Sequence, residues 1–374
     1  MRRLAWPVTA LLLAAVTGAL IADLGRQEQD RPLPSASPST GPQASPTHAE
    51  PSSPAISVMK PRGRTADFQA GMTLVVYANS PDLGPGAAPL LDRLADLGVN
   101  SLSVAFPFYQ RSWTSSTVEA STDTTPSPQN LAGLMRAARQ RHFTLMLRPL
   151  IDEQSLIADG QWRGSLRPSS VRGWFESYAG MVLPYAALAQ HERVEILCVG
   201  TELVSLEQHT QEWMDLIAKV RAVFDGLLTY CANWDSFARP TFWDALDFVG
   251  IDGFFPLNAP AQASVEEMLA AWRPWAQRLE QFQRSVGKPI VLTEQGVTSQ
   301  RGSHRQPWLW DQGTPIDLEG QGRYYRATCE ALRGVVSGMY WWAVELGVPN
   351  GPAVDGGYSP LAKPAESEIR RCFV

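Results

Sequence analysis

Eight short runs of apolar and β-branched residues recur along the chain, and helical segments fit between most of them. Short apolar runs bounded by polar residues predict buried strands, and their alternation with helices predicts a parallel sheet covered by helices. Eight strands are the number that closes a (β/α)8 barrel, or TIM barrel, which is the α/β fold we expect. The predicted strands are Thr73–Tyr77, Ser101–Phe106, Thr144–Leu147, Ile196–Val199, Leu228–Ala232, Phe248–Ile251, Ile290–Thr293 and Gly338–Trp342.

Two of the predicted helices carry a clear apolar stripe, which indicates a core face and has no functional message. Residues 128–141 form the first of them, and the second stripe runs from Trp213 to Phe224. The link between the fifth and sixth strands is short, so a shortened helix is expected around residues 242–246. A doubly wound open sheet is the competing architecture, but the sequence lacks its glycine-rich phosphate loop.

The N-terminal part of the chain differs from the rest. In residues 1–25, two arginines precede an apolar run from Leu4 to Ala22, a pattern typical of export segments. This run leaves two alternatives open, a cleaved signal peptide or an N-terminal membrane anchor. Residues 26–65 are rich in Pro, Ser and Thr and are interpreted as an extended, disordered linker. We therefore expect a single catalytic domain at 66–374, located outside the cytoplasm, either secreted or tethered.

Composition narrows the range of partners. The formal net charge is −5 and no basic run follows the first residues, so a nucleic-acid partner is not expected. The chain contains 13 Trp, 13 Phe and 9 Tyr. Aromatic rings of this kind suit stacking on sugars, although Trp also fills large cores. No cysteine or histidine pattern has metal-ligand spacing, so neither a metal nor another cofactor is expected. The oligomeric state is left open.

The four cysteines fall into two pairs. Cys198 and Cys231 lie inside predicted strands, where a small buried thiol is the expected role. Cys329 and Cys372 lie in a predicted helix and near the C-terminus, and an oxidising compartment would allow a disulfide between them. The alternative is that both remain free.

Two glutamates directly follow predicted strands. Glu202 in CVGTEL comes after the fourth strand, and Glu294 in VLTEQG comes after the seventh. Because all strands of a parallel barrel end on the same rim, residues far apart in sequence converge there. Cleavage of a glycosidic bond with retention needs one carboxyl group to protonate the leaving oxygen and another to attack the anomeric carbon. The pair therefore indicates a glycosidase, although strand ends also carry ordinary polar residues.

Other residues beyond the strand ends describe a carbohydrate cleft better than a cofactor site. They combine carboxylates, an arginine, an amide and indoles, and the sequence has neither a GxSxG elbow nor a paired-histidine metal motif. The candidate sugar-binding residues are Tyr109, Arg148, Asp152, Trp162, Asn233, Trp234, Asp252, Trp341 and Trp342.

Structural roles remain open for several of these candidates. Adjacent residues of a strand point in opposite directions, so only one of Trp341 and Trp342 can face the barrel lumen. Arg148 and Asp252 would also suit a structural ion pair near the rim. Asn233 would also suit a turn.

A set of motifs between Gly71 and Phe373 adds a family resemblance. The motifs are LRPLID, QWRG, ILCVGTEL, YCANWD, DFVGIDGFFPL, KPIVLTEQG, MYWWAVE and SPLAKPAE. Together they resemble glycoside hydrolase family 113, retaining β-mannanases of a large clan of (β/α)8 glycosidases. The resemblance implies that Glu202 is the acid/base, that Glu294 is the nucleophile and that the substrate is β-1,4-mannan.

The sequence departs from this pattern at several positions. The clan commonly places a tyrosine after the sixth strand, where this chain has Phe254. Ala343 and Val344 stand where an aromatic residue is expected after Trp342. Gln295 and Val297 replace a more usual pairing after the nucleophile. A catalytically weak or inactive glycan-binding envelope protein is therefore the alternative function, and a hydrolase of the organism's own exopolysaccharide or wall glycan is a third. Endo or exo action is left open.

The proposed mechanism requires opposite protonation states for the two glutamates at one pH. Apolar surroundings and a neighbouring negative charge are expected to raise the pKa of Glu202. We expect Arg148 to hold Glu294 ionised.

Overall fold

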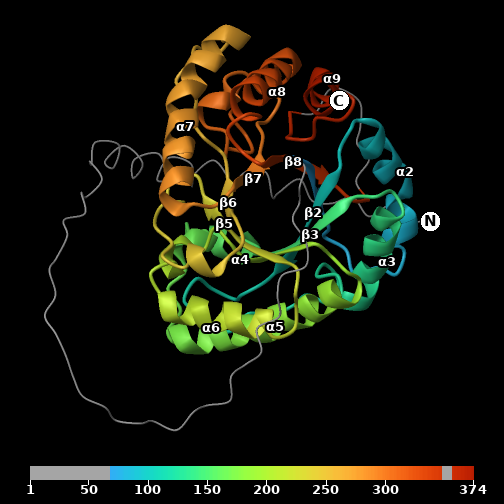
Figure 1. The fold of residues 1–374 in the computed structure, drawn as a ribbon, viewed down its shortest axis with the longest axis vertical. Coiled ribbons are helices and arrows are strands. Elements are labelled where there is room, and N and C mark those ends of the chain that lie inside the picture. Colours follow the sequence, from blue (N-terminus) through green and yellow to red (C-terminus); the bar gives the residue numbers. More distant parts are fainter. Residues whose placement is uncertain (1–67, 348–355) are drawn as a thin grey trace, which may run out of the picture.

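The computed structural model describes residues 68–347 and 356–374, and its strands close into one parallel barrel in the order of the sequence (Figure 1). The predicted TIM barrel is therefore confirmed, whereas residues 1–25 and the whole predicted linker, 26–65, lie outside the described residues. The strands are β1 Gln69–Val75, β2 Ser101–Phe108, β3 Thr144–Ile151, β4 Ile196–Thr201, β5 Leu227–Asn233, β6 Val249–Asp252, β7 Ile290–Gln295 and β8 Gly338–Glu345.

Helices surround the barrel as an outer ring (Figure 1). The longer ones are α2 Leu83–Asp96, α3 Pro128–Arg139, α5 Val171–His191, α6 Thr210–Arg221, α7 Val265–Val286, α8 Leu318–Leu332 and α9 Pro364–Phe373. The short elements are α4 Gln154–Ile157 and the 3-10 turns η2 Arg163–Ser165, η3 Val204–Leu206, η4 Trp243–Ala245 and η5 Ser303–Arg305. The apolar stripes of α3 and α6 are buried, as predicted. Between β5 and β6 the chain forms only η4, which confirms the shortened link.

Helix α7 illustrates how the local sequence sets the ends of an element. The Ser264 hydroxyl accepts a hydrogen bond from the backbone N–H of Glu267, and the Glu267 carboxylate accepts one from the N–H of Ser264 at 2.8 Å. This capping box satisfies two donors that a helix start leaves unpaired. The helix ends at Gly287, whose φ of 64° favours glycine.

The position of β1 differs from the prediction. We expected this strand at Thr73–Tyr77, but it begins earlier, at Gln69, where it pairs with Gly338 of β8. Pairing across the barrel closure therefore defines the start of β1, and the apolar pattern of the segment alone does not.

The interior of the barrel is layered. Its lower layer is apolar and contains Met146, Ile196, Cys198, Cys231, Phe248, Val291 and Tyr340. Cys198 and Cys231 are free, buried thiols as predicted, with their sulfur atoms 2.8 Å apart. Because side chains alternate along a strand, residues two positions further on point into the same interior. The layer above therefore receives Arg148 from β3, Thr293 from β7 and Trp342 from β8.

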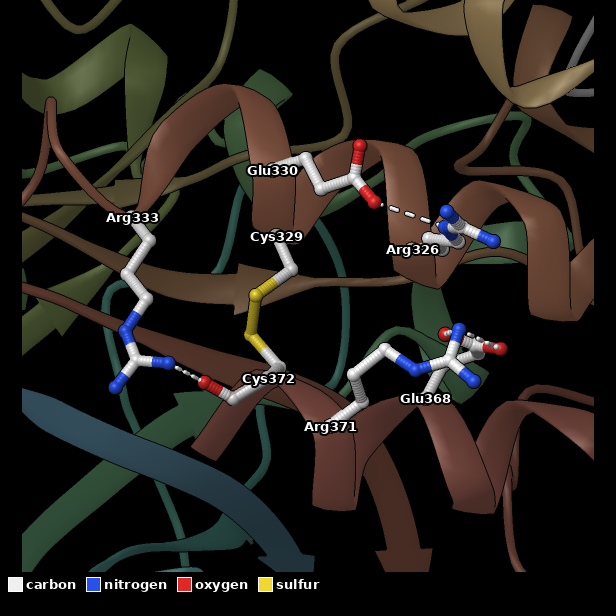
Figure 2. The surroundings of a disulfide bond; sticks show 7 residues. All are labelled: Arg326, Cys329, Glu330, Arg333, Glu368, Arg371 and Cys372. Atoms are coloured by element: carbon white, nitrogen blue, oxygen red, sulfur yellow. Dashed lines mark hydrogen bonds and ion pairs between the residues drawn. A yellow bond between two sulfur atoms is a disulfide. The ribbon is translucent and has the colours of Figure 1, made fainter. Parts of the chain in front are cut away.

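The C-terminal helix α9 completes the ring between α8 and α2 (Figure 1). Figure 2 shows the disulfide between Cys329 of α8 and Cys372 of α9. Of the two alternatives for this pair, a disulfide or two free thiols, the structure therefore has the disulfide. Arg333 donates to the backbone oxygen of Cys372 beside it. On the other flank, Arg93 of α2 and Glu366 of α9 form a two-point ion pair at 2.7 Å. Both neighbours therefore hold α9 in place.

Within the described ranges, no helix combines the length and apolar character needed to cross a membrane.

The disulfide is expected to stabilise the domain, because it closes a loop with a sequence separation of 43. Replacing Cys329 and Cys372 by serine should lower the free energy of unfolding by about 2–4 kcal/mol. Urea denaturation with and without a reductant checks this. Reductant should destabilise the wild type and leave the double variant unchanged, and equal stability of the two oxidised proteins would contradict the prediction.

Candidate active site

Glu202 stands directly after β4 with a backbone φ of 52°, and its side chain is held by an arginine from another loop. Arg163 of η2 donates through Nη1 to Oε2 of Glu202 at 2.8 Å. The Arg163 Nε donates to the backbone oxygen of Ile151 at 2.9 Å and lies 3.4 Å from Oε1 of Glu153. The contacts with Ile151 and Glu153 therefore orient the guanidinium toward Glu202.

Glu294 lies near the end of β7, above a fully buried ion pair. Arg148 of β3 contacts Glu294 directly through Nη2, and the same nitrogen lies 2.6 Å from Oδ2 of Asp252 on β6. The hydroxyl of Thr293 donates to the other oxygen of Asp252 at 2.8 Å. The alternative of a structural ion pair between Arg148 and Asp252 is thus realised, and Glu294 forms part of the same cluster.

Burial dominates the electrostatics of both glutamates. It raises the pKa of Glu202 to about 7, and the charge of Asp252 adds to this rise while Arg163 opposes it. The raised pKa of Glu202 is as predicted. Burial also raises the pKa of Glu294 well above its usual value, and the guanidinium of Arg148 opposes this rise without cancelling it. The expectation that Arg148 holds Glu294 ionised stays a prediction, because the contact between the two side chains favours the ionised form and burial opposes it.

A cleft at this end of the barrel is lined by both glutamates. Four of the candidate sugar-binding residues line it, namely Trp162, Asn233, Trp234 and Trp342. Trp342 also lies over Arg148, with its ring centroid 6.0 Å from the guanidinium carbon. Arg148 and Asp252 have no exposed side-chain surface, so they act below the cleft wall and not as contacts to a sugar.

Three predicted sugar-binding residues lie elsewhere. Trp341 is fully buried and stacks on Tyr325 of α8, with ring centroids 4.0 Å apart. Of the two adjacent tryptophans, it is therefore the one that packs in the core. Asp152 accepts hydrogen bonds from the Tyr77 hydroxyl at 2.6 Å and from the N–H of Gln154. The Tyr109 hydroxyl bonds to Thr124, and neither Tyr109 nor Asp152 lines the cleft.

Several cleft residues escaped the sequence prediction because they lie far from a strand end. Trp308, Leu309 and Trp310 come from the long segment after β7, and Tyr358 comes from the segment before α9. The indole of Trp308 stacks on Trp234 with centroids 5.4 Å apart, whereas 57% of Trp310 is exposed. The tripeptide Trp308–Trp310, two indoles in a polar segment, was the available signal.

Phe254 also lines the cleft, and it is the residue at which the family resemblance led us to expect a tyrosine hydroxyl. The ring of Tyr358 packs edge-on against it, with centroids 6.1 Å apart. The Tyr358 hydroxyl donates to the backbone oxygen of Pro307 at 2.5 Å, so it is already engaged. Tyr358 therefore supports the wall of the cleft without replacing the missing hydroxyl.

In the part of the chain that the structure describes, no group of three or more His, Cys, Asp or Glu residues has the geometry to hold a metal ion.

Comparison with known proteins now decides the family. The model of Glycoside Hydrolase Family 113 matches residues 83–363, a span that includes both glutamates. The chain belongs to glycoside hydrolase family 113. It is therefore a glycoside hydrolase, and it is similar to β-mannanases.

Solved family 113 structures resemble this chain along most of its length. The β-mannanase AaManA from Alicyclobacillus acidocaldarius, solved in complex with ManMIm, is 26% identical, with a TM-score of 0.72 and coverage of 83% of this chain and 98% of that one. A family 113 β-1,4-mannanase is 25% identical, with a TM-score of 0.74 and coverage of 82% and 99%. A family 5 mannosidase from Rhizomucor miehei, 14% identical with a TM-score of 0.52 and coverage of 84% and 95%, shares the fold. No protein of curated function matched the sequence.

Arg148 is expected to be essential for stability as well as activity. The Arg148→Met variant leaves Asp252 and Glu294 buried without a positive partner, which should cost about 3–5 kcal/mol of folding free energy at neutral pH. Urea denaturation measures the loss. The matched control is Arg172→Met, which breaks the exposed pair with Glu176 and should change stability little. Similar losses in both variants would contradict the prediction.

Proposed function

We propose that this family 113 enzyme hydrolyses β-1,4-linked mannan with retention of anomeric configuration. The observation that carries the proposal is that Glu202 and Glu294 both line one cleft, together with several indoles. Each glutamate contacts a guanidinium group of its own, Arg163 for Glu202 and Arg148 for Glu294. Such a pair of carboxyl groups can perform acid/base and nucleophilic steps on opposite sides of one bond.

The proposed reaction has two steps. First, the carboxylate of Glu294 attacks the anomeric carbon while Glu202 transfers its proton to the glycosidic oxygen, so the bond to the leaving sugar breaks and a glycosyl ester forms. Second, the carboxylate of Glu202 removes a proton from water, and the resulting oxygen attacks the anomeric carbon. The ester bond to Glu294 then breaks, and both carboxyl groups return to their starting states.

The buried cluster supports this division of roles. The carboxyl groups of Glu202, Glu294 and Asp252 face the guanidinium groups of Arg148 and Arg163, so one proton brings these five groups to neutrality. Arg148 lies against Glu294 and Asp252 together, which favours their ionised forms over that of Glu202. We infer that the shared proton resides on Glu202, in keeping with a pKa of about 7 for this carboxyl group.

The substrate and the site of action are proposed on further grounds. Two solved structures of similar proteins are described as β-mannanases, at 26% and 25% identity. Several tryptophans line the cleft, and flat aromatic side chains suit stacking on sugar rings. Location outside the cytoplasm is supported by the disulfide between Cys329 and Cys372 and by the export-like residues 1–25.

One observation favours the alternative of a weak or inactive glycan-binding protein. Phe254 removes a hydroxyl from the site, and the Tyr358 hydroxyl beside it is engaged elsewhere. Both functions predict binding of mannan oligosaccharides, and only hydrolysis separates them.

The decisive test is incubation of the purified protein with β-1,4-mannan oligosaccharides while the anomeric configuration of the first product is followed by NMR. We expect a β-product from the wild type, and a loss of about 10³-fold or more in rate for Glu294→Gln and Glu202→Gln. The Glu202→Gln variant should be partly spared on a dinitrophenyl glycoside, because this leaving group needs no proton. An α-product, or an unaffected Glu294→Gln variant, would refute the mechanism, and binding without turnover would favour the alternative.

The pH dependence should report the protonation of Glu202. Because the acid must carry its proton and its pKa is about 7, kcat/KM on mannan oligosaccharides should be lost as the pH rises through about 7. This loss of kcat/KM at high pH should disappear with a dinitrophenyl glycoside. The loss of kcat/KM on mannan oligosaccharides should persist in Glu207→Gln. This variant is the control, because burial also raises the pKa of Glu207, to about 8. If kcat/KM falls at the same pH on both substrates, the titrating group is not Glu202.

A further inference from the structure

The backbone at Glu202 adopts a conformation that its own sequence does not favour. Its φ of 52° lies in the left-handed region, which residues other than glycine, asparagine and aspartate rarely enter. The residue also follows an irregularity in the sheet, where the register between β4 and β5 shifts between Cys198 and Thr201. The N–H of Glu202 still donates to the backbone oxygen of Cys231 at 2.8 Å. Something beyond the strand must therefore hold the next peptide in place.

The next peptide is held by a tyrosine of β5. The N–H of Leu203 donates to the hydroxyl oxygen of Tyr230 at 2.8 Å, and Leu203 is only 1% exposed. At such burial, solvent cannot readily replace the tyrosine as acceptor. The ring of Tyr230 is itself fixed, with centroids 5.1 Å from Trp213 and 5.4 Å from Phe242.

The tyrosine hydroxyl is oriented in turn by a buried glutamate. A hydroxyl that accepts from Leu203 directs its own proton elsewhere, and here it donates to Oε1 of Glu207 at 3.1 Å. Glu207 follows η3 and is 3% exposed. Burial raises its pKa to about 8, while the hydrogen bond from Tyr230 and the charge of Arg239 oppose the rise. A buried carboxyl group with no place in the catalytic cleft thus ends a chain of hydrogen bonds that starts next to Glu202.

We propose that Tyr230 and Glu207 are positioning residues that hold the left-handed backbone at Glu202 and thereby aim its carboxyl group at the leaving oxygen. The inference rests on the proposed role of Glu202 as acid/base. Without the Tyr230 hydroxyl, the N–H of Leu203 is buried and unpaired, so the peptide rotates to find another acceptor. The Glu202 side chain then turns away from Arg163 and from the cleft.

The test compares Tyr230→Phe with wild type in the full chain, using two substrates. On mannan oligosaccharides, which need the acid, kcat/KM should fall about tenfold to a hundredfold. On a dinitrophenyl glycoside, kcat/KM should stay within about twofold, because its first step needs no proton. Azide, which attacks the glycosyl ester without a general base, should raise kcat of the variant on the dinitrophenyl glycoside and yield a glycosyl azide.

Matched variants separate positioning from general damage to the core. Tyr185→Phe removes a buried hydroxyl that donates to the backbone oxygen of Pro126, away from the cleft, and should leave both substrates unaffected. Glu207→Gln keeps an oxygen acceptor for Tyr230 and should retain most activity, whereas Glu207→Leu should resemble Tyr230→Phe. Equal losses on both substrates in Tyr230→Phe, or no loss on either, would overturn the proposal.

A crystal structure of Tyr230→Phe tests the inference even if the wild type hydrolyses nothing. Absence of wild-type turnover would count against the proposed function alone. In the variant, we expect φ of Glu202 to leave the left-handed region and the contact with Arg163 to be lost. An unchanged φ and an unchanged contact would refute the positioning role whether or not the protein is an active hydrolase.

Discussion

The buried guanidinium of Arg148 is the constraint on which the upper half of the barrel depends. It extends from β3 into the lumen and contacts Asp252 of β6 and Glu294 of β7, so it joins strands that lie across the barrel from each other. A buried charge without a partner costs several kcal/mol, which means that none of the three groups is tolerated alone. The apolar layer below, with Met146 and Val291, closes the barrel floor and keeps water away from the ions. Fold and active site are therefore one structure at this level.

The same constraint explains why the two glutamates differ. Glu294 belongs to β7, where it pairs with Asp252 just past a shift in register between β6 and β7, and it contacts Arg148 directly. Glu202 lies beyond the end of β4, and its partner Arg163 comes from a loop between β3 and α5. Arg163 also serves Glu153, so its charge is divided between two carboxylates. Positive charge therefore stabilises the ionised form of Glu202 less than that of Glu294, so we expect a proton to bind to Glu202.

Much of this arrangement could be predicted from the sequence because it depends on local patterns. Buried parallel strands are continuous apolar runs, and the rim of the barrel collects the residues that follow them, which was sufficient to find Glu202, Glu294 and Trp342. The sequence could not show which of the adjacent Trp341 and Trp342 faces the barrel lumen. This depends on the tertiary contact in which Trp341 stacks on Tyr325. Long segments bring Trp308 and Tyr358 into the cleft, and no periodicity marks them. The raised pKa of Glu294 depends on burial depth, which is a property of the assembled barrel.

Different parts of the structure thus hold the two candidate catalytic glutamates, and the proposed mechanism explains why. A nucleophile attacks one carbon from one direction, so a carboxyl group fixed by strand pairing suits it. An acid/base must serve the leaving oxygen in the first step and a water molecule in the second, at positions that need not coincide. Glu202 is held by side chains instead, because Arg163 donates to its carboxylate and the neighbouring N–H of Leu203 donates to the hydroxyl of Tyr230. The left-handed residue at the end of β4 is then the point where the chain leaves the sheet and these side-chain contacts take over.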